Sequence, residues 1–240
     1  FLLDKVNKYE LKGQINRFSN LKFIYRTQLH VPFTLGRSAR GIAFGSELRK
    51  DPIFEIIYQA SKKKDPKDIR DGFFEILKKE SNLNTCDIVG LKNNKKLKQF
   101  PPWSYVLPWE NTQIEKKFKN YENSQRLKRK EKSIEYNFEN LTNDNNYIYS
   151  IEMAESQVMQ SIRLLESISK CGYKTELGIP SFHILIKDKE WRWYMSQGNH
   201  RAYILYLLNY DFLYGTIDSV IKKEKSHLWP NVKNGLFNIE

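Results

Sequence analysis

The sequence predicts an α+β protein, with a largely helical N-terminal region followed by a small mixed sheet and flanking helices. Residues 52–61, 66–80 and 155–170 repeat apolar side chains at three- and four-residue spacing, which is typical of amphipathic helices. Residues 182–195 place two runs rich in aromatic and β-branched side chains around a tight turn, which predicts a β-hairpin. A largely helical N-terminal half, together with a small mixed sheet and flanking helices in the C-terminal half, corresponds to the α+β class.

Length and composition favour a soluble globular chain of one large domain or two small ones. The 240 residues, 40% of them hydrophobic, are enough to bury a core without disulfides or metals. The most apolar stretch, 202–213, is interrupted by Asn209 and Asp211, so no membrane-spanning helix is expected. Two isolated cysteines, Cys86 and Cys171, provide neither a disulfide framework nor a zinc site, and a cytoplasmic location is the simplest interpretation.

The formal net charge of +12 has two interpretations. Strongly basic proteins commonly bind polyanions such as nucleic acid or nucleotide phosphates. The chain is also rich in Lys, Asn, Ile and Tyr, whose codons are A/T-rich, and such a codon bias raises the lysine content without selection for binding. The overall charge by itself therefore does not identify a partner.

The N-terminal region, residues 1–146, contains several segments with more than one interpretation. Residues 21–31 predict a strand, and the Gly- and Arg-rich segment 34–49 is either a phosphate contact or an irregular surface loop. The proline- and tryptophan-rich connector 100–110 either caps a core or grips a base or sugar. Residues 114–136, with their basic stretch at 116–132, predict a solvated helix or a phosphate-backbone contact. The polar cluster 140–146 then marks a boundary with a second domain at 147–240.

The second domain has a clear order of elements. A strand at 147–151 precedes the helix 155–170, which we expect to end at Gly172. The hairpin follows, then an apolar helix at 202–208 and a last strand at 214–221.

A short motif, Gly198-Asn199-His200-Arg201, opens that apolar helix. A helix N-terminus presents unpaired N–H groups and a partial positive charge, and glycine lets an anion approach closely. Asn199 and Ser196 can cap or donate, while Arg201 can bind phosphate oxygens through two N–H groups. The alternative is that His200 and Arg201 pair with nearby carboxylates.

This motif, with the elements around it, resembles the ParB/sulfiredoxin-like (ParB N-terminal domain-like) superfamily over about residues 147–221, and residues 1–146 are not covered. The resemblance implies a small mixed sheet with flanking helices and a box that binds nucleotide phosphates. Sulfiredoxins have a nucleophilic cysteine where this chain has Asn199, so sulfinic-acid reduction is not expected. ParB proteins have Glu and Arg after the glycine and a helix-turn-helix downstream, so chromosome partitioning is not expected either.

The resemblance is strongest to kinases of this fold and implies an ATP-dependent phosphotransferase acting on a small hydroxyl-bearing substrate. ATP or another nucleotide and Mg²⁺ are the implied cofactors, with no metal site made by the protein alone. Glu152 and Glu155 are the candidates for general base or Mg²⁺ ligand, with His200 as a third catalytic candidate. Either glutamate can instead be an ordinary helix-start carboxylate. Arg163 is a weaker candidate, which is expected to face solvent.

Two other functions remain open at this point. One is a ParB-like nucleic-acid-binding protein without catalysis, which uses the basic stretch at 116–132. The other is a scaffold that binds nucleotide without turnover. The sequence indicates no oligomeric state.

Overall fold

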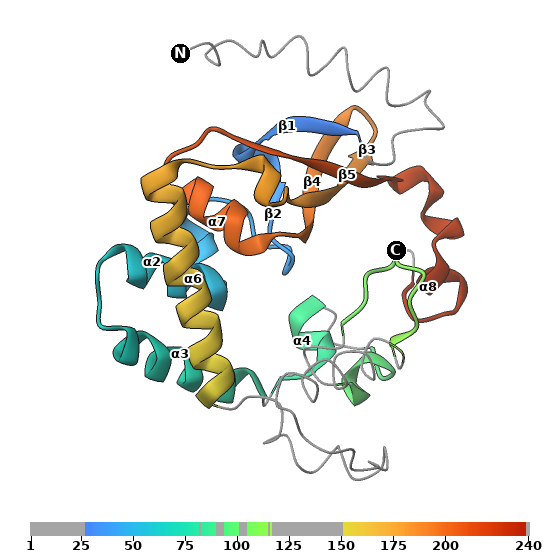
Figure 1. Cartoon of the computed structure of the whole chain (residues 1–240). Helices are drawn as coiled ribbons and strands as arrows, with labels where there is room; N and C mark the ends of the chain where they lie inside the picture. The colour runs from blue at the N-terminus through green and yellow to red at the C-terminus, as the bar shows by residue number, and fades with distance from the viewer. Residues whose placement is uncertain are drawn as a thin grey trace.

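The computed structural model describes residues 27–81, 83–89, 94–100, 105–114, 116 and 151–238. Within them, a five-stranded mixed sheet packs against helices, which confirms the α+β class (Figure 1). The strand order is β1-β5-β3-β4-β2. The pairs β1/β5 and β3/β4 are antiparallel, whereas β3/β5 and β2/β4 are parallel.

The strands confirm the predicted hairpin and the predicted last strand. Their bounds are β1 Gln28–Pro32, β2 Gly36–Arg37, β3 Ser181–Lys187, β4 Glu190–Gln197 and β5 Phe212–Lys222. The turn between β3 and β4 places Asp188 at φ 53°, a left-handed conformation that Asp adopts more readily than most residues. Part of the Gly- and Arg-rich segment 34–49 forms β2 and pairs with β4. The segment is therefore not wholly an irregular loop.

The helices include all three amphipathic segments that periodicity predicts. Their bounds are α2 Pro52–Ser61, α3 Pro66–Ser81, α4 Thr85–Val89, α6 Ile151–Cys171, α7 Asn199–Leu207 and α8 Pro230–Lys233. Asp51 caps α2, since its Oδ1 accepts a hydrogen bond of 3.0 Å from the N–H of Ile53, and Pro52 occupies the first helical position. Gly172, at φ 75°, ends α6 as predicted.

The start of α6 corrects one prediction. Ile151, assigned from the sequence to a strand at 147–151, is the first residue of this helix, and residues 147–150 lie outside the described part. The apolar helical spacing continues backwards through Ala154, which is fully buried with Val158 against α2 and α3. Packing of this face outweighs the strand preference of a short aromatic and β-branched run.

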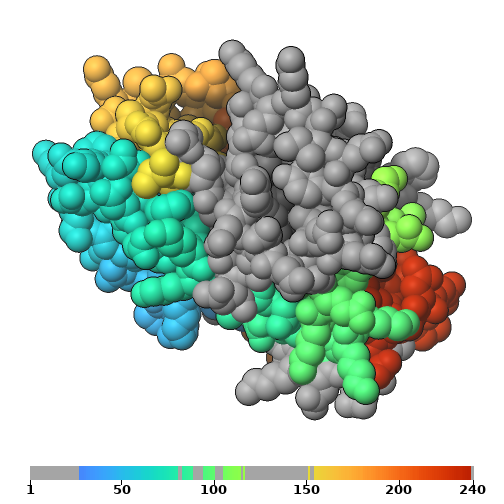
Figure 2. Space-filling view, turned by 90° about the horizontal axis from the view of Figure 1, so that it is seen from below, coloured from blue at the N-terminus to red at the C-terminus, as the bar shows by residue number. Residues whose placement is uncertain are grey.

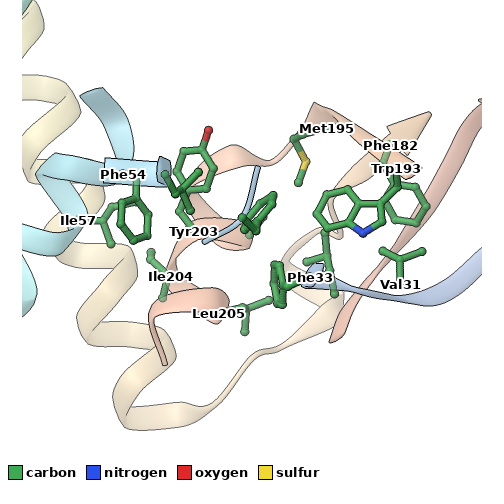
Figure 3. Packing of buried hydrophobic residues seen from close by; sticks show 14 of the residues in the cluster. Val31, Phe33, Phe54, Ile57, Phe182, Trp193, Met195, Tyr203, Ile204 and Leu205 are labelled. Carbon is green, nitrogen blue, oxygen red and sulfur yellow. The ribbon is translucent and has the colours of Figure 1, made fainter. Parts of the chain in front are cut away.

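The main core lies between the sheet and α7, with α2 and α6 on the far side of α7 (Figure 1). Trp193 of β4 is fully buried, and its Nε1 donates to the carbonyl of Pro32 at 2.7 Å. Figure 3 shows Phe33 beside Trp193, and Tyr203 of α7 close to Phe54 of α2. The middle of α7 is covered by the sheet on one side and by α2 and α6 on the other, which explains its buried apolar run from Ala202 to Leu205.

A second, smaller core joins the connector to the C-terminal segment. Phe100, Val106 and Ile114 are buried there with Leu236 and Phe237. Figure 2 shows the corresponding green and red surfaces in contact at one end of the molecule. The connector therefore caps a core, as one of its two interpretations predicts, although residues 101–104 are not described.

The proposed division at residue 146 does not separate two sheets. β1 and β2, from the first predicted domain, pair with β5 and β4 from the second. The basic stretch 116–132, apart from Lys116, and the polar cluster 140–146 lie outside the described residues. No helix in the described part of the chain is long and apolar enough to cross a membrane.

Candidate anion-binding site

The first turn of α7 begins at a glycine that the backbone requires. Gly198 is the N-cap residue and has φ 86° and ψ 27°, in the left-handed region. A Cβ atom at this position would lie 2.9 Å from the Cα of Pro180. No side chain of the described residues caps the helix at Gly198, so Ser196 and Asn199 do not cap it, and their alternative role as hydrogen-bond donors to an anion stays a prediction. The N–H groups of this turn therefore have no side-chain cap to compete with an anion.

A cleft of about 930 Å³ opens in front of this turn, between α7 and one face of α6. The α7 wall consists of Gly198, Asn199, His200 and Arg201, so the structure brings the predicted box together on one surface. The α6 wall is a stripe at helical spacing, made by Ser156, Met159, Gln160, Arg163, Leu164 and Ser167.

Two arginine residues, Arg163 and Arg201, line this cleft. Arg201 Nη2 donates to the carbonyl of Leu177 at 2.8 Å, and its guanidinium lies beside Gly178. No carboxylate among the described residues forms an ion pair with Arg201, so the carboxylate-pairing alternative gains no support there. Arg163 is exposed, as expected, but it also lines the cleft. The cleft thus has positive charge on both walls.

His200 and Asn199 carry polar atoms that burial leaves without partners. His200 Nε2 and Asn199 Oδ1 are inaccessible to solvent and have no hydrogen-bond partner among the described residues. Burial lowers the pKa of His200, and the positive charge of Arg201 lowers it further. The imidazole is therefore neutral at pH 7 and can donate one hydrogen bond and accept another.

Of the two predicted carboxylates, only Glu155 has a described side chain. Glu155 is exposed and does not line the cleft. Glu152 is in the first turn of α6, four residues before Ser156 and hence on the same helix face, but its side chain is not described. Ser196 is half-buried in β4 and does not line the cleft either. The box and the two glutamates thus do not form a single described constellation.

Sequence reasoning missed the polar stripe of α6. Ser156, Gln160, Arg163 and Ser167 follow one another at intervals of four, three and four, the spacing of one helix face. Their spacing was readable in the sequence, but only the fold shows that this face lies opposite the box. Among the described residues, no group of histidine, cysteine and carboxylate side chains is placed to hold a metal ion.

Comparison of the chain with protein-family models, with curated proteins and with solved structures finds no match in any of the three. The geometry of the cleft is therefore the basis for a functional proposal.

The lowered pKa of His200 predicts a pH dependence of stability. The pKa of His200 in the folded protein lies below its pKa in the unfolded chain. As pH falls through about 6.5, His200 therefore takes up a proton in the unfolded state before it does so in the folded state. The stabilisation is present above the pKa that His200 has in the unfolded chain, and it is lost as pH falls towards the pKa that His200 has in the folded protein. Urea titrations at about pH 7.5 and about pH 5.5 measure the free energy of unfolding. Between these two pH values, His200→Gln should lose less of this free energy than the wild type. Equal losses would contradict the burial argument.

Proposed function

We propose that the cleft between α6 and α7 binds the phosphates of a nucleotide or a similar small phosphorylated ligand. The observation that carries this proposal is the convergence of a helix N-terminus without a side-chain cap and two arginine residues on one cleft. A helix N-terminus carries about half a positive charge, and arginine binds phosphate oxygens through two parallel N–H groups. Together they favour an anion with several oxygens over a neutral ligand.

The remaining lining residues suit a nucleotide. Ser156, Gln160 and Ser167 supply hydrogen-bonding groups, while Met159 and Leu164 supply apolar surface for a base or sugar. A cleft of about 930 Å³ is large enough for such a ligand.

Phosphoryl transfer is a further step in the proposal, and it depends on a carboxylate. The described lining residues offer none to a substrate hydroxyl or to Mg²⁺. We place this role on Glu152, because its position in α6 is on the face that lines the cleft. Phosphate binding itself rests on the N–H groups and the two arginines, without a metal held by the protein.

Thermal unfolding with millimolar ATP tests the binding step. A ligand at about 100 times its Kd adds about 2.7 kcal/mol to the free energy of unfolding, which raises Tm clearly. We expect ATP and inorganic pyrophosphate to raise Tm and adenosine to have a much smaller effect. The double variant Arg163→Ala with Arg201→Ala should lose the shift.

Lys170→Ala is the matched control, because it removes an exposed cation from the same helix without touching the cleft. It should keep the wild-type shift. If the arginine double variant keeps the shift as well, or if no phosphate raises Tm, the proposal is wrong. ADP release in the presence of candidate hydroxyl substrates tests the transfer step, and Glu152→Gln should abolish turnover while preserving the shift.

A further inference from the structure

A second cavity, separate from the α6/α7 cleft, lies at the end of the β3/β4 hairpin. It has a volume of about 270 Å³. Its walls come from the ends of β3 and β5, the start of β4, the connector and the residue before α8, and they include Trp109, Lys187, Trp191, Arg192, Lys223 and Trp229. Three of these are tryptophans brought together from distant parts of the chain, and we call this cavity the tryptophan groove.

The indole rings of the groove are partly exposed, and two of them pack edge to face. Trp109 meets Trp229 edge to face, with ring centroids 5.6 Å apart at 78°, and it meets Tyr194 at 6.0 Å and 85°. Trp109, Trp191 and Trp229 are all half-buried, whereas Trp193 is wholly inside the main core. The buried Nε1 of Trp109 has no acceptor among the described residues. These rings thus offer aromatic surface that the cores do not fully use.

The charges around the groove are predominantly positive. Lys187, Arg192 and Lys223 line the groove, and Glu190 is the one acidic residue among its described lining residues. Arg192 Nη1 donates to the carbonyl of Trp191, and among the described residues no carboxylate forms an ion pair with it. Arg37 of β2 is close enough that its pKa is lowered, first by burial and then by the charge of Arg192. Neither guanidinium group forms an ion pair with a carboxylate among the described residues, so this edge of the sheet is attractive to an anion.

We propose that the tryptophan groove binds single-stranded nucleic acid, with a base stacked on an indole and the flanking phosphates paired with Arg192, Lys187 and Lys223. Proteins that bind single-stranded nucleic acid combine aromatic rings with cationic side chains, because every base has a face that can stack on a ring and every nucleotide linkage carries a phosphate. A duplex keeps its bases stacked within itself and cannot insert one without unstacking it. A quaternary ammonium ligand also binds aromatic cages, but three cations against one carboxylate oppose a positive ligand.

Fluorescence anisotropy with a labelled single-stranded oligonucleotide and the full chain tests this proposal. We expect binding that weakens steeply with added salt, and weaker binding of the matching duplex. Trp229→Ala should reduce affinity roughly 5- to 160-fold, since stacking on one aromatic side chain contributes about 1–3 kcal/mol. Lys223→Glu, an exposed charge reversal, tests the phosphate contact without removing a packed ring.

Lys170→Ala, which removes an exposed cation that lines neither cavity, is the control, and it should bind the oligonucleotide like the wild type. If Trp229→Ala and Lys223→Glu both bind like the wild type, the contact lies elsewhere, for example in the basic stretch 116–132, and the proposal is wrong. Equal affinity for the duplex, or tryptophan quenching by tetramethylammonium without quenching by the oligonucleotide, would also overturn it. Should Trp229→Ala unfold, Lys223→Glu and quenching of the wild type by the oligonucleotide decide the question.

Discussion

Replacing Gly36 by alanine is expected to destabilise the protein by about 3 kcal/mol, the upper end of the usual range for overpacking a core. A Cβ atom on Gly36 would lie 2.6 Å from Cε2 of Trp193 and 2.8 Å from Cδ2 of Phe44. Both rings are buried, and the indole is also held by its hydrogen bond to Pro32, so neither can move away cheaply. For a chain of this length the change corresponds to a drop in Tm of roughly 6–12 °C.

Gly72→Ala is the matched control for this prediction. Gly72 is in α3, and nothing lies within 4 Å of a Cβ atom placed there. Alanine is the better helix former, so this variant should gain about 0.5–1 kcal/mol. Urea unfolding of the two variants beside the wild type measures both effects. A Gly36→Ala protein as stable as the wild type would show that the sheet edge at β2 packs less tightly than described.

Gly198→Ala is expected to affect both stability and ligand binding. The backbone of the alanine would be forced into the left-handed conformation, which costs about 1–2 kcal/mol. Its Cβ atom would lie within about 3 Å of Pro180, and this contact costs a further 1–3 kcal/mol. Relief of the contact requires the first turn of α7 to move, and this turn supplies the N–H groups of the proposed phosphate site. We therefore expect the ATP-dependent rise in Tm to be reduced along with the Tm itself.

Gly172→Ala separates the two causes. Gly172 has φ 75°, similar to Gly198, but nothing lies within 4 Å of its Cβ position. Its substitution should cost only the conformational strain, about 1–2 kcal/mol, and leave the ATP-dependent shift in Tm intact. Thermal scans of both variants with and without ATP check this. Equal losses of stability, with the shift retained in both, would mean that the turn at Gly198 tolerates a side chain.

Local patterns predicted the elements whose stabilising contacts recur at short spacing. The hairpin of β3 and β4, the helices α2 and α3 and the body of α6 all follow from residue periodicity. Ile151 shows the limit of this reasoning, because a short apolar run does not distinguish a strand from the beginning of a packed helix.

The candidate site was predictable in one half only. The box at residues 198–201 signals a helix N-terminus by its glycine and by the apolar run that follows. The opposite wall, with Gln160 and Arg163, comes from a helix some forty residues earlier, and its polar stripe has the same pattern as an ordinary solvated face.

The sequence by itself determined where most helices and strands form and that a glycine must open α7, because these depend on side-chain periodicity and on backbone conformation at single residues. Three features were decided only by the tertiary structure. β1 and β2 complete the sheet of the C-terminal half of the chain, Arg163 and Arg201 line the same α6/α7 cleft, and three tryptophans line one groove. Such pairings join residues far apart in the chain, as between Leu29 and Gly215, and they depend on the shapes of two surfaces that no local pattern contains.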